Sequence, residues 1–225
     1  MMTNLFSSFD PSTNSLISLN WASMMIFLIF LGSKFWVSDS KASKVINLIL
    51  QTLFNETKVI IPNSMFFSIM LIAIFMFILI NNFMGLFPYI FTGTSHMAIS
   101  LAVAFPLWLG LMLFGWIKHN KHMFAHLVPQ STPGVLMPFM VLIESTSNII
   151  RPLTLAIRLS ANMIAGHLLM TLLGNQLAAT ADSPALVGVM LAQLALSTLE
   201  MAVSMIQAYV FFILLTLYLG EIENH

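Results

Sequence analysis

The chain contains no cysteine and very few charged residues. Only 7% of its 225 residues are Asp, Glu, Lys or Arg, whereas 59% are hydrophobic; charged residues make up about 25% of an ordinary soluble domain. The absence of cysteine excludes disulfides, thiol catalysis and cysteine-ligated zinc or iron–sulfur sites. The scarcity of charge excludes an ordinary water-soluble enzyme, a disordered tail and a nucleic-acid binder, which needs a basic surface. The composition that remains is typical of an integral membrane protein.

The beginning of the chain also lacks basic residues. Residues 1–15 contain Asp10 but no Lys or Arg. A secretory signal needs a basic start, and a mitochondrial transit peptide needs Arg. We therefore expect neither kind of targeting segment, and we expect the protein to insert into the membrane through its own apolar segments.

Long apolar runs predict an all-α integral membrane protein. The runs at 16–37, 64–90 and 97–117 are each long enough to cross a bilayer as a helix, which takes about 20 residues. We expect the second and third runs to form a transmembrane hairpin. Residues 38–58 place apolar side chains at helical spacing and polar ones elsewhere, which predicts an amphipathic helix on the membrane surface. A solvated linker is the alternative for this segment.

The positions of the lysines predict the orientation of the chain in the membrane. The loops after the first and third spans carry them, whereas the short turn near residue 93 has none. Basic loops stay on the inner side of a membrane, so we expect the N-terminus outside and both lysine loops inside. The lysines that support this orientation are Lys34, Lys41, Lys44, Lys58, Lys118 and Lys121.

The last two apolar segments, 134–181 and 185–220, are too long for upright membrane helices. Residues 152–181 alone would make a helix of about 45 Å, and residues 185–220 one of about 54 Å. The hydrocarbon core of a bilayer is only about 30 Å thick. We therefore predict two steeply tilted helices joined by a turn at Asp182–Pro184.

Polar residues form one stripe on each of these long segments. On the first, steps of seven bring three charged residues to one helix face, and two asparagines join them. An apolar helix with a single polar stripe buries that stripe against protein or water rather than lipid. The first stripe consists of Glu144, Asn148, Arg151, Arg158 and Asn162, and the second of Gln193, Ser197, Glu200, Ser204 and Gln207.

Charged residues inside a membrane segment are functional candidates, because they are costly to place there. His167 lies nine residues after Arg158, on the opposite side of the helix, where we expect it to face Glu200 across the hairpin. A histidine changes charge near neutral pH, so this pair is predicted to relay protons. Small residues flank Arg158 and let another helix approach, so we expect a partner helix with a carboxylate there. A purely structural Arg158, paired with Gln207 or Glu144, is the alternative.

The residues around Arg158 resemble a known signature. The segment RPLTLAIRLSANMIAGHLL, residues 151–169, resembles the signature of subunit a of F-type ATP synthases, in which Arg, Asn, Gly and His stand at fixed spacing. The resemblance extends through IESTSNII at 143–150 and IQAYVF at 206–211, and the span pattern fits along essentially the whole chain. It is greatest to the mitochondrial form, in which His and Glu exchange the places that they often have in bacterial members.

This resemblance implies a function and a location. A member of this family is a proton-translocating stator subunit that stands beside a ring of proton-carrying c subunits. It provides two aqueous half-channels and so couples proton flow to ATP synthesis. It would be a multi-pass protein of the mitochondrial inner membrane, with its N-terminus in the intermembrane space and its basic loops in the matrix. Its other partners would be the peripheral stalk, further membrane subunits and lipid. It would perform no catalysis by itself and would need no cofactor or metal.

The resemblance also implies roles for individual residues. Arg158 matches the essential arginine, which favours the ionised ring carboxylate and separates the two half-channels. His167 and Glu200 match the half-channel on the intermembrane-space side, and Glu144 matches the exit on the matrix side. The remaining candidates for the proton path are Asn162 and Gln207 as polar neighbours of the arginine, Asn148 and Arg151 as exit-path or packing residues, and Ser197 and Ser204 from the second stripe.

Two other classes of membrane protein fit the sequence less well. A bis-histidine haem protein needs two histidines facing each other in the membrane, and only His167 lies deep in an apolar run. A secondary transporter favours internal repeats, and none is visible. His119, His122 and His126 have the spacing of one helix face, but no fourth metal ligand is evident, and an interfacial cluster is the more usual arrangement. The residues from Glu221 onward are expected to form a solvated tail.

Overall fold

A computed structural model shows the protein as helices without strands over the residues that it describes. Four of these helices are long and apolar enough to cross a membrane. The all-α membrane architecture predicted from the sequence is therefore confirmed. The described residues are 5–12, 18–25, 28, 40–62, 65–120, 123–124, 127–128, 134, 136–179 and 186–223.

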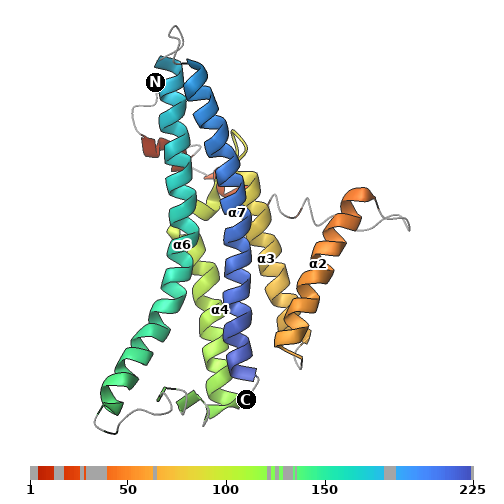
Figure 1. The fold of residues 1–225 in the computed structure, drawn as a ribbon, viewed down its shortest axis with the longest axis vertical. Helices are drawn as coiled ribbons and strands as arrows, with labels where there is room; N and C mark the ends of the chain where they lie inside the picture. The colour runs from red at the N-terminus through yellow and green to blue at the C-terminus, as the bar shows by residue number, and fades with distance from the viewer. Residues whose placement is uncertain are drawn as a thin grey trace. The chain divides into compact units, whose positions relative to one another are not determined.

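The helices follow the apolar runs of the sequence (Figure 1). Long α-helices make up most of the described chain, and short 3-10 helices lie near its beginning and before α4. In chain order the elements are η1 (Leu5–Phe9), η2 (Leu19–Met25), α2 (Lys41–Ile60), α3 (Met65–Gly85), η3 (Gly93–Ser95), α4 (Met97–Lys118), α6 (Met137–Ala179) and α7 (Leu186–Glu223).

The first predicted span, 16–37, lies largely outside the described residues. The described part of it, 18–25 and residue 28, contains the 3-10 helix η2. This segment is not among the four membrane-crossing candidates, for which only the described residues count. A membrane span here therefore stays a prediction.

Helix α2 stands where the amphipathic segment 38–58 was expected. The side-chain oxygen of Ser40 caps its first turn by accepting a hydrogen bond of 3.2 Å from the backbone N–H of Ser43. Val45 and Leu48 expose apolar side chains, whereas Leu53 is buried. An exposed apolar face beside polar residues is the arrangement that a helix on a membrane surface needs.

Helix α3 ends at Gly85, before the limit of 90 that the apolar run indicates. Pro88 has no backbone N–H and disfavours a helical conformation at Phe87. Tyr89 has a φ of 70°, which is incompatible with a right-handed helix. Residues 86–92 are therefore an irregular connection between α3 and η3.

Helices α6 and α7 are the longest elements, with 43 and 38 residues. They measure about 65 and 57 Å, about twice the thickness of a hydrocarbon core. Helix α6 begins at Met137 rather than 134, and α7 continues to Glu223, beyond the expected end at 220. The turn expected at Asp182–Pro184 lies outside the described residues. The steep tilt stays a prediction, because a tilt is defined against a bilayer.

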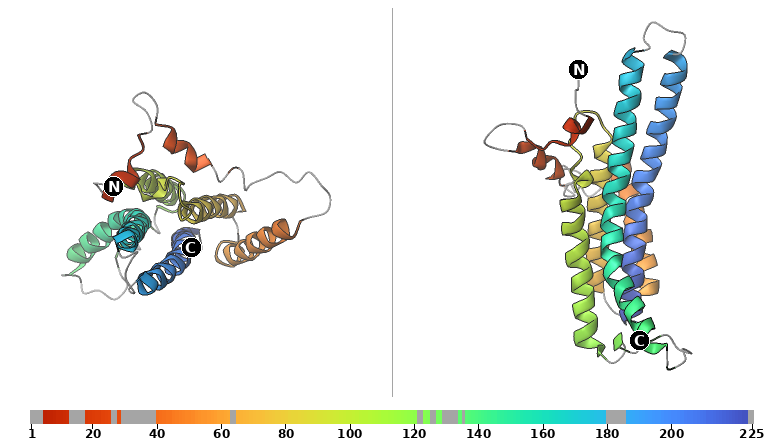
Figure 2. Two further views of the ribbon diagram at one scale, coloured as in Figure 1. Left: turned by 90° about the horizontal axis from the view of Figure 1, so that it is seen from above. Right: turned by 90° about the vertical axis from the view of Figure 1, so that its left-hand side faces the viewer.

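The chain packs as two compact units, each with its own core. In the first unit Leu159 and Met163 of α6 and Ala208 of α7 are buried, and these parts of the two helices lie side by side (Figure 2). In the second unit the ring centres of Phe75 and Phe212 are 5.6 Å apart. The first unit consists of residues 1–33, 76–100 and 158–209, and the second of residues 34–75, 101–157 and 210–225.

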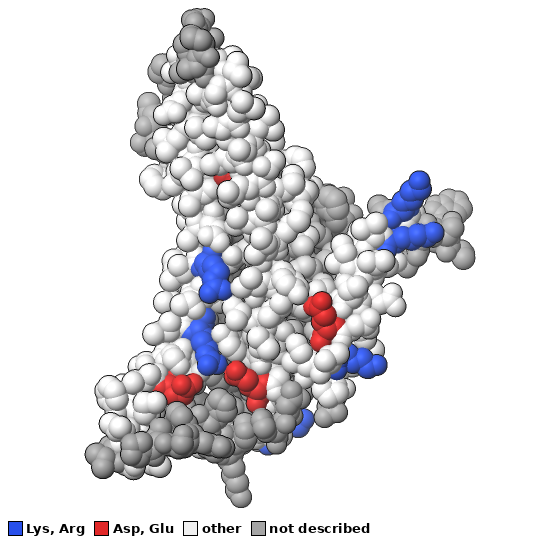
Figure 3. Space-filling view, viewed as in Figure 1, with Lys and Arg blue, Asp and Glu red and all other residues white. Residues whose placement is uncertain are grey.

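Charged side chains are sparse on the surface (Figure 3). On the face shown, wide areas over α6 and α7 carry no charge, as expected for helices that face lipid or other membrane subunits. The few charges on these helices are therefore the groups whose positions need an explanation.

Candidate functional site

Arg158 is an exposed cation on an apolar helix. Its neighbours Leu159 and Ser160 are buried, whereas Arg158 itself is exposed. Within the described part of the chain, no carboxylate forms an ion pair with its guanidinium. The structural alternative, a pairing with Gln207 or Glu144, is therefore not found there. Glu144 pairs instead with Arg151, and Gln207 with Asn162.

Asn162 and Gln207 join the two polar stripes. Nδ2 of Asn162 donates a hydrogen bond of 3.0 Å to Oε1 of Gln207. Gln207 is buried, and Asn162 lies one helical turn after Arg158. This pair therefore holds α6 against α7 and orders the helix face that carries the arginine.

Glu200 packs against the backbone of α6, next to His167. A Cβ added at Gly166 would lie 2.7 Å from Oε1 of Glu200, so the carboxylate fills the space that the missing side chain leaves. Glu200 is only 8% exposed. Among the described residues, neither its carboxylate oxygens nor Nε2 of His167 has a hydrogen-bond partner. The expected proximity is therefore present, but no hydrogen bond joins the two side chains, and water is the usual partner for such buried groups.

A cavity of about 880 Å³, here called the His167 cavity, lies in the first unit. Gln193 and Ser197 of the second stripe line it together with His167. The N-terminal segment also lines it, through Phe9 and Asn20. The ring of Phe9 meets that of His167 edge-on, with 6.2 Å between the ring centres. The sequence contains no sign of this wall, because no periodicity or motif relates the N-terminal residues to His167.

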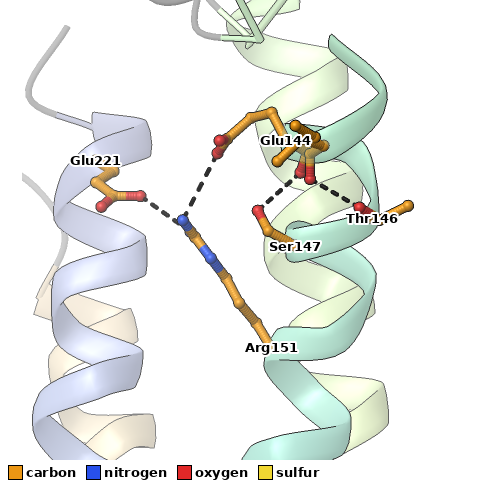
Figure 4. A network of polar contacts seen from close by, with 6 residues as sticks. Glu144, Thr146, Ser147, Arg151 and Glu221 are labelled. Atoms are coloured by element: carbon orange, nitrogen blue, oxygen red, sulfur yellow. Dashed lines mark hydrogen bonds and ion pairs between the residues drawn. The ribbon is translucent and has the colours of Figure 1, made fainter. Parts of the chain in front are cut away.

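Arg151 is the centre of a second group of charges, in the second unit (Figure 4). Its Nη2 lies 3.8 Å from Oε1 of Glu144, and its Nη1 lies 3.5 Å from Oε2 of Glu221. Its guanidinium carbon lies 4.9 Å from the ring centre of Tyr218, within the range of a cation–π contact. These four residues, here called the arginine cluster, line a cavity of about 300 Å³ together with Asn148.

The C-terminal end of α7 differs from the expected solvated tail. Helix α7 continues to Glu223, so Glu221 stands three residues after Tyr218 on the same helix face. That face meets Arg151. The sequence offers little sign of this longer helix, because Ile222 is the only apolar residue after Gly220 and a single residue sets no helical pattern.

Ser204 and three histidines of the loop after α4 are also candidates from the sequence, and the structure describes Ser204 and one of these histidines. The hydroxyl of Ser204 is buried and donates a hydrogen bond of 2.8 Å to the backbone carbonyl of Met201 in its own helix. His119 is described, but His122 and His126 lie outside the described residues. No group of three or more possible metal ligands occurs among the residues that the structure describes.

Comparison with known proteins gives one consistent result. The family model described as ATP synthase A chain matches residues 15–220. The chain is 56% identical to ATP synthase subunit a of Anopheles quadrimaculatus, over 99% of this chain and 100% of that protein. It is 57% identical to ATP synthase subunit a of Drosophila mauritiana and 54% identical to that of Locusta migratoria, with the same coverage.

Proposed function

The chain belongs to the ATP synthase subunit a family, and from this membership we propose that it is the stator that passes protons to and from a rotating ring of c subunits. As a member of this family, it is a component of the membrane sector of the ATP synthase and a multi-pass protein of the mitochondrial inner membrane. The proposal adds two aqueous half-channels, one open to each side of the membrane. Bond chemistry belongs to other subunits of the complex.

The observation that carries the proposal is the exposed guanidinium of Arg158. Arginine stays protonated when it is desolvated, and an unpaired cation at membrane depth is costly. The described part of this chain offers it no carboxylate. A carboxylate on a neighbouring subunit that faces α6 would supply the missing charge. A fixed cation at that contact favours the ionised ring carboxylate and keeps protons from crossing directly between the half-channels.

The His167 cavity is proposed as the half-channel on the intermembrane-space side. It leads to the half-buried imidazole of His167, and Glu200 lies against the adjacent Gly166. Both side chains present polar atoms without a partner among the described residues. A bound water between them would complete a path for protons, since each group can both take up and release one.

The arginine cluster is proposed to lie on the half-channel of the matrix side. Glu144 is the carboxylate that hands protons on there, and Asn148 lines the same cavity. Arg151 stays protonated and does not itself carry the transferred proton. The peripheral stalk and further membrane subunits are the other proposed partners.

The test is passive proton flux through membrane vesicles that hold the complete synthase with its catalytic head removed. Flux under an imposed potential is compared between the native chain and Arg158→Gln. We expect loss of the flux that depends on the ring, or a leak that no longer needs rotation. Lys118→Gln, which removes one cation at the end of α4, is the matched control and should keep native flux. Unchanged, ring-coupled flux in Arg158→Gln would make the arginine structural and would overturn its proposed role between the half-channels.

The orientation is tested separately. We propose that the N-terminus lies in the intermembrane space and that the lysine loops lie in the matrix. Because the chain has no cysteine, a single Ser12→Cys variant offers one labelling site. An impermeant thiol reagent should label it from the intermembrane-space side only, and labelling only from the matrix side would reverse the topology.

A further inference from the structure

The N-terminal segment meets the loop before α4 at a notch that a glycine leaves. Helices η2 and η3 lie against each other within the first unit. A Cβ added at Gly93 would overlap Sδ of Met24 and would lie 2.8 Å from its Cγ. Gly93 is buried, so Met24 fills the space that a larger side chain at this position would need. The close approach of the two segments therefore depends on the glycine.

Aromatic rings and a hydrogen bond hold the same contact. The ring centre of Trp21 lies 5.1 Å from that of His96 and 5.7 Å from that of Phe91. Aromatic pairs attract each other at roughly 4.5–7 Å. Oγ of Ser23 donates a hydrogen bond of 2.9 Å to the backbone carbonyl of Phe91. This set of contacts, here called the N-terminal clasp, joins Trp21, Ser23 and Met24 of η2 to Phe91, Gly93 and His96.

The N-terminal clasp is connected to the His167 cavity through the N-terminal segment itself. Asn20 directly precedes Trp21 and lines the cavity. Its Nδ2 donates a hydrogen bond of 3.4 Å to the backbone carbonyl of Asp10. The residue before Asp10 is Phe9, whose ring lies edge-on against the imidazole of His167. The N-terminal wall of the cavity is therefore held by the clasp at one end and by the contact with His167 at the other.

We propose that the N-terminal clasp positions this wall of the half-channel on the intermembrane-space side, and that Trp21 and Gly93 are positioning residues for proton delivery to His167. The inference rests on the proposed function, in which the His167 cavity is that half-channel. Ser8 and Asn20 give the wall two polar side chains, which water in a cavity needs. If the wall moves away, lipid chains, which form no hydrogen bonds, replace it and interrupt a path through water.

The first test moves the wall without changing a residue that lines the cavity. Gly93→Ala pushes Met24, and with it η2, away from the loop. Ser8→Cys adds a reporter thiol to a chain that has no cysteine, and mass spectrometry follows its labelling by N-ethylmaleimide in membranes that hold the complete synthase. We expect Gly93→Ala to raise the labelling rate roughly tenfold, the order that overpacking of this kind produces. An unchanged rate would overturn the inference.

Ring-coupled proton flux in the head-stripped vesicles, measured without the reporter, is the second readout. We expect Gly93→Ala to lower the flux roughly tenfold, because the wall is misplaced. Met24→Ala removes the atoms that the new Cβ would meet, so the double variant should regain most of the flux and label slowly again. A fold that is merely destabilised loses more from a second truncation, and no recovery would overturn the inference.

Gly188→Ala is the matched control in the same unit. A Cβ added at Gly188 meets no atom within 4 Å, so this variant should keep the native labelling rate and the native flux. A change as large as that in Gly93→Ala would show that any added methyl group has this effect, and it would overturn the inference.

The aromatic contact gives an independent test in case Gly93→Ala reduces the amount of assembled complex. Trp21→Phe keeps a ring against His96 and Phe91, whereas Trp21→Ala removes it. We expect faster labelling of the reporter thiol and lower flux per complex in Trp21→Ala than in Trp21→Phe. Equal labelling rates in the two variants would overturn the inference.

The outcomes separate this inference from the function beneath it. Faster labelling with native flux in Gly93→Ala, together with loss of coupling in Arg158→Gln, would remove the wall from the proton path and leave the half-channel proposal standing. Native, ring-coupled flux in Arg158→Gln would remove the half-channel proposal itself, and with it the role of the wall in proton delivery.

Discussion

Gly166 should control proton flux without carrying a proton. In Gly166→Ala the added Cβ would lie 2.7 Å from Oε1, 2.9 Å from Cδ and 3.2 Å from Cγ of Glu200. Ordinary contact needs at least 3.4 Å, so the carboxylate has to move away from α6. Overpacking of this kind costs about 1–3 kcal/mol, with the low end expected because the end of a flexible side chain gives way. Replacing a glycine by alanine inside a helix stabilises the helix by about 1 kcal/mol, because alanine has the higher helix propensity.

The net change in stability should therefore be within about 1 kcal/mol, while the position of the carboxylate changes. A displacement of about 1 Å can reduce the rate of a positioned group about a hundredfold, so we expect ring-coupled proton flux to fall about tenfold or more. The assay combines thermal unfolding of the assembled complex with flux in head-stripped vesicles. Gly174→Ala is the matched control on α6, because its Cβ meets no atom within 4 Å. Native flux in Gly166→Ala would refute the role of Glu200 at this contact.

Three further predictions concern the first unit. Asn162→Leu leaves the buried carbonyl of Gln207 without its partner, so unfolding should become easier by about 1–3 kcal/mol, and adding Gln207→Leu should recover part of this loss in a thermal melt. Phe9→Ala removes the ring that contacts the imidazole of His167, so an imidazole-modifying reagent should label His167 faster. Phe9→Leu should change the rate less. Asp10→Asn should leave the pH profile of flux unchanged between about pH 5 and 8. The backbone N–H of Ser12 donates a hydrogen bond to the Asp10 carboxylate and lowers its pKa, so this carboxylate stays ionised throughout that range. A shifted profile would contradict this prediction.

The spacing of residues predicted which polar side chains of α6 and α7 lie near one another, because residues at a given spacing on a regular helix point in a known direction. Steps of three, four and seven put Asn162 on the arginine face and Gln207 on the second stripe, and these two side chains share a hydrogen bond. The same reasoning directed His167 away from Arg158 and toward Glu200, which lies against the neighbouring Gly166. Their functional roles stay proposals, and mutation is the way to test them.

Spacing could not predict contacts between segments that share no repeat. The wall that Phe9 adds to the His167 cavity depends on how the N-terminal segment folds back, and its sequence has no pattern that specifies a partner. The pairing of Arg151 with Glu221 joins residues 70 positions apart. It also needs α7 to remain helical past its last long apolar run.

The sequence by itself determined the membrane class, the helical segments, the two polar stripes and the family signature around Arg158. Each of these follows from composition or from local periodicity, and a helix satisfies its backbone hydrogen bonds within one segment. Only the tertiary structure decided which polar groups have partners and which do not. It paired Arg151 with two carboxylates, left Arg158 without an ion pair among the described residues, and set Glu200 in the gap at Gly166. Such contacts depend on how closely two helices approach and at what register, which neither helix specifies alone.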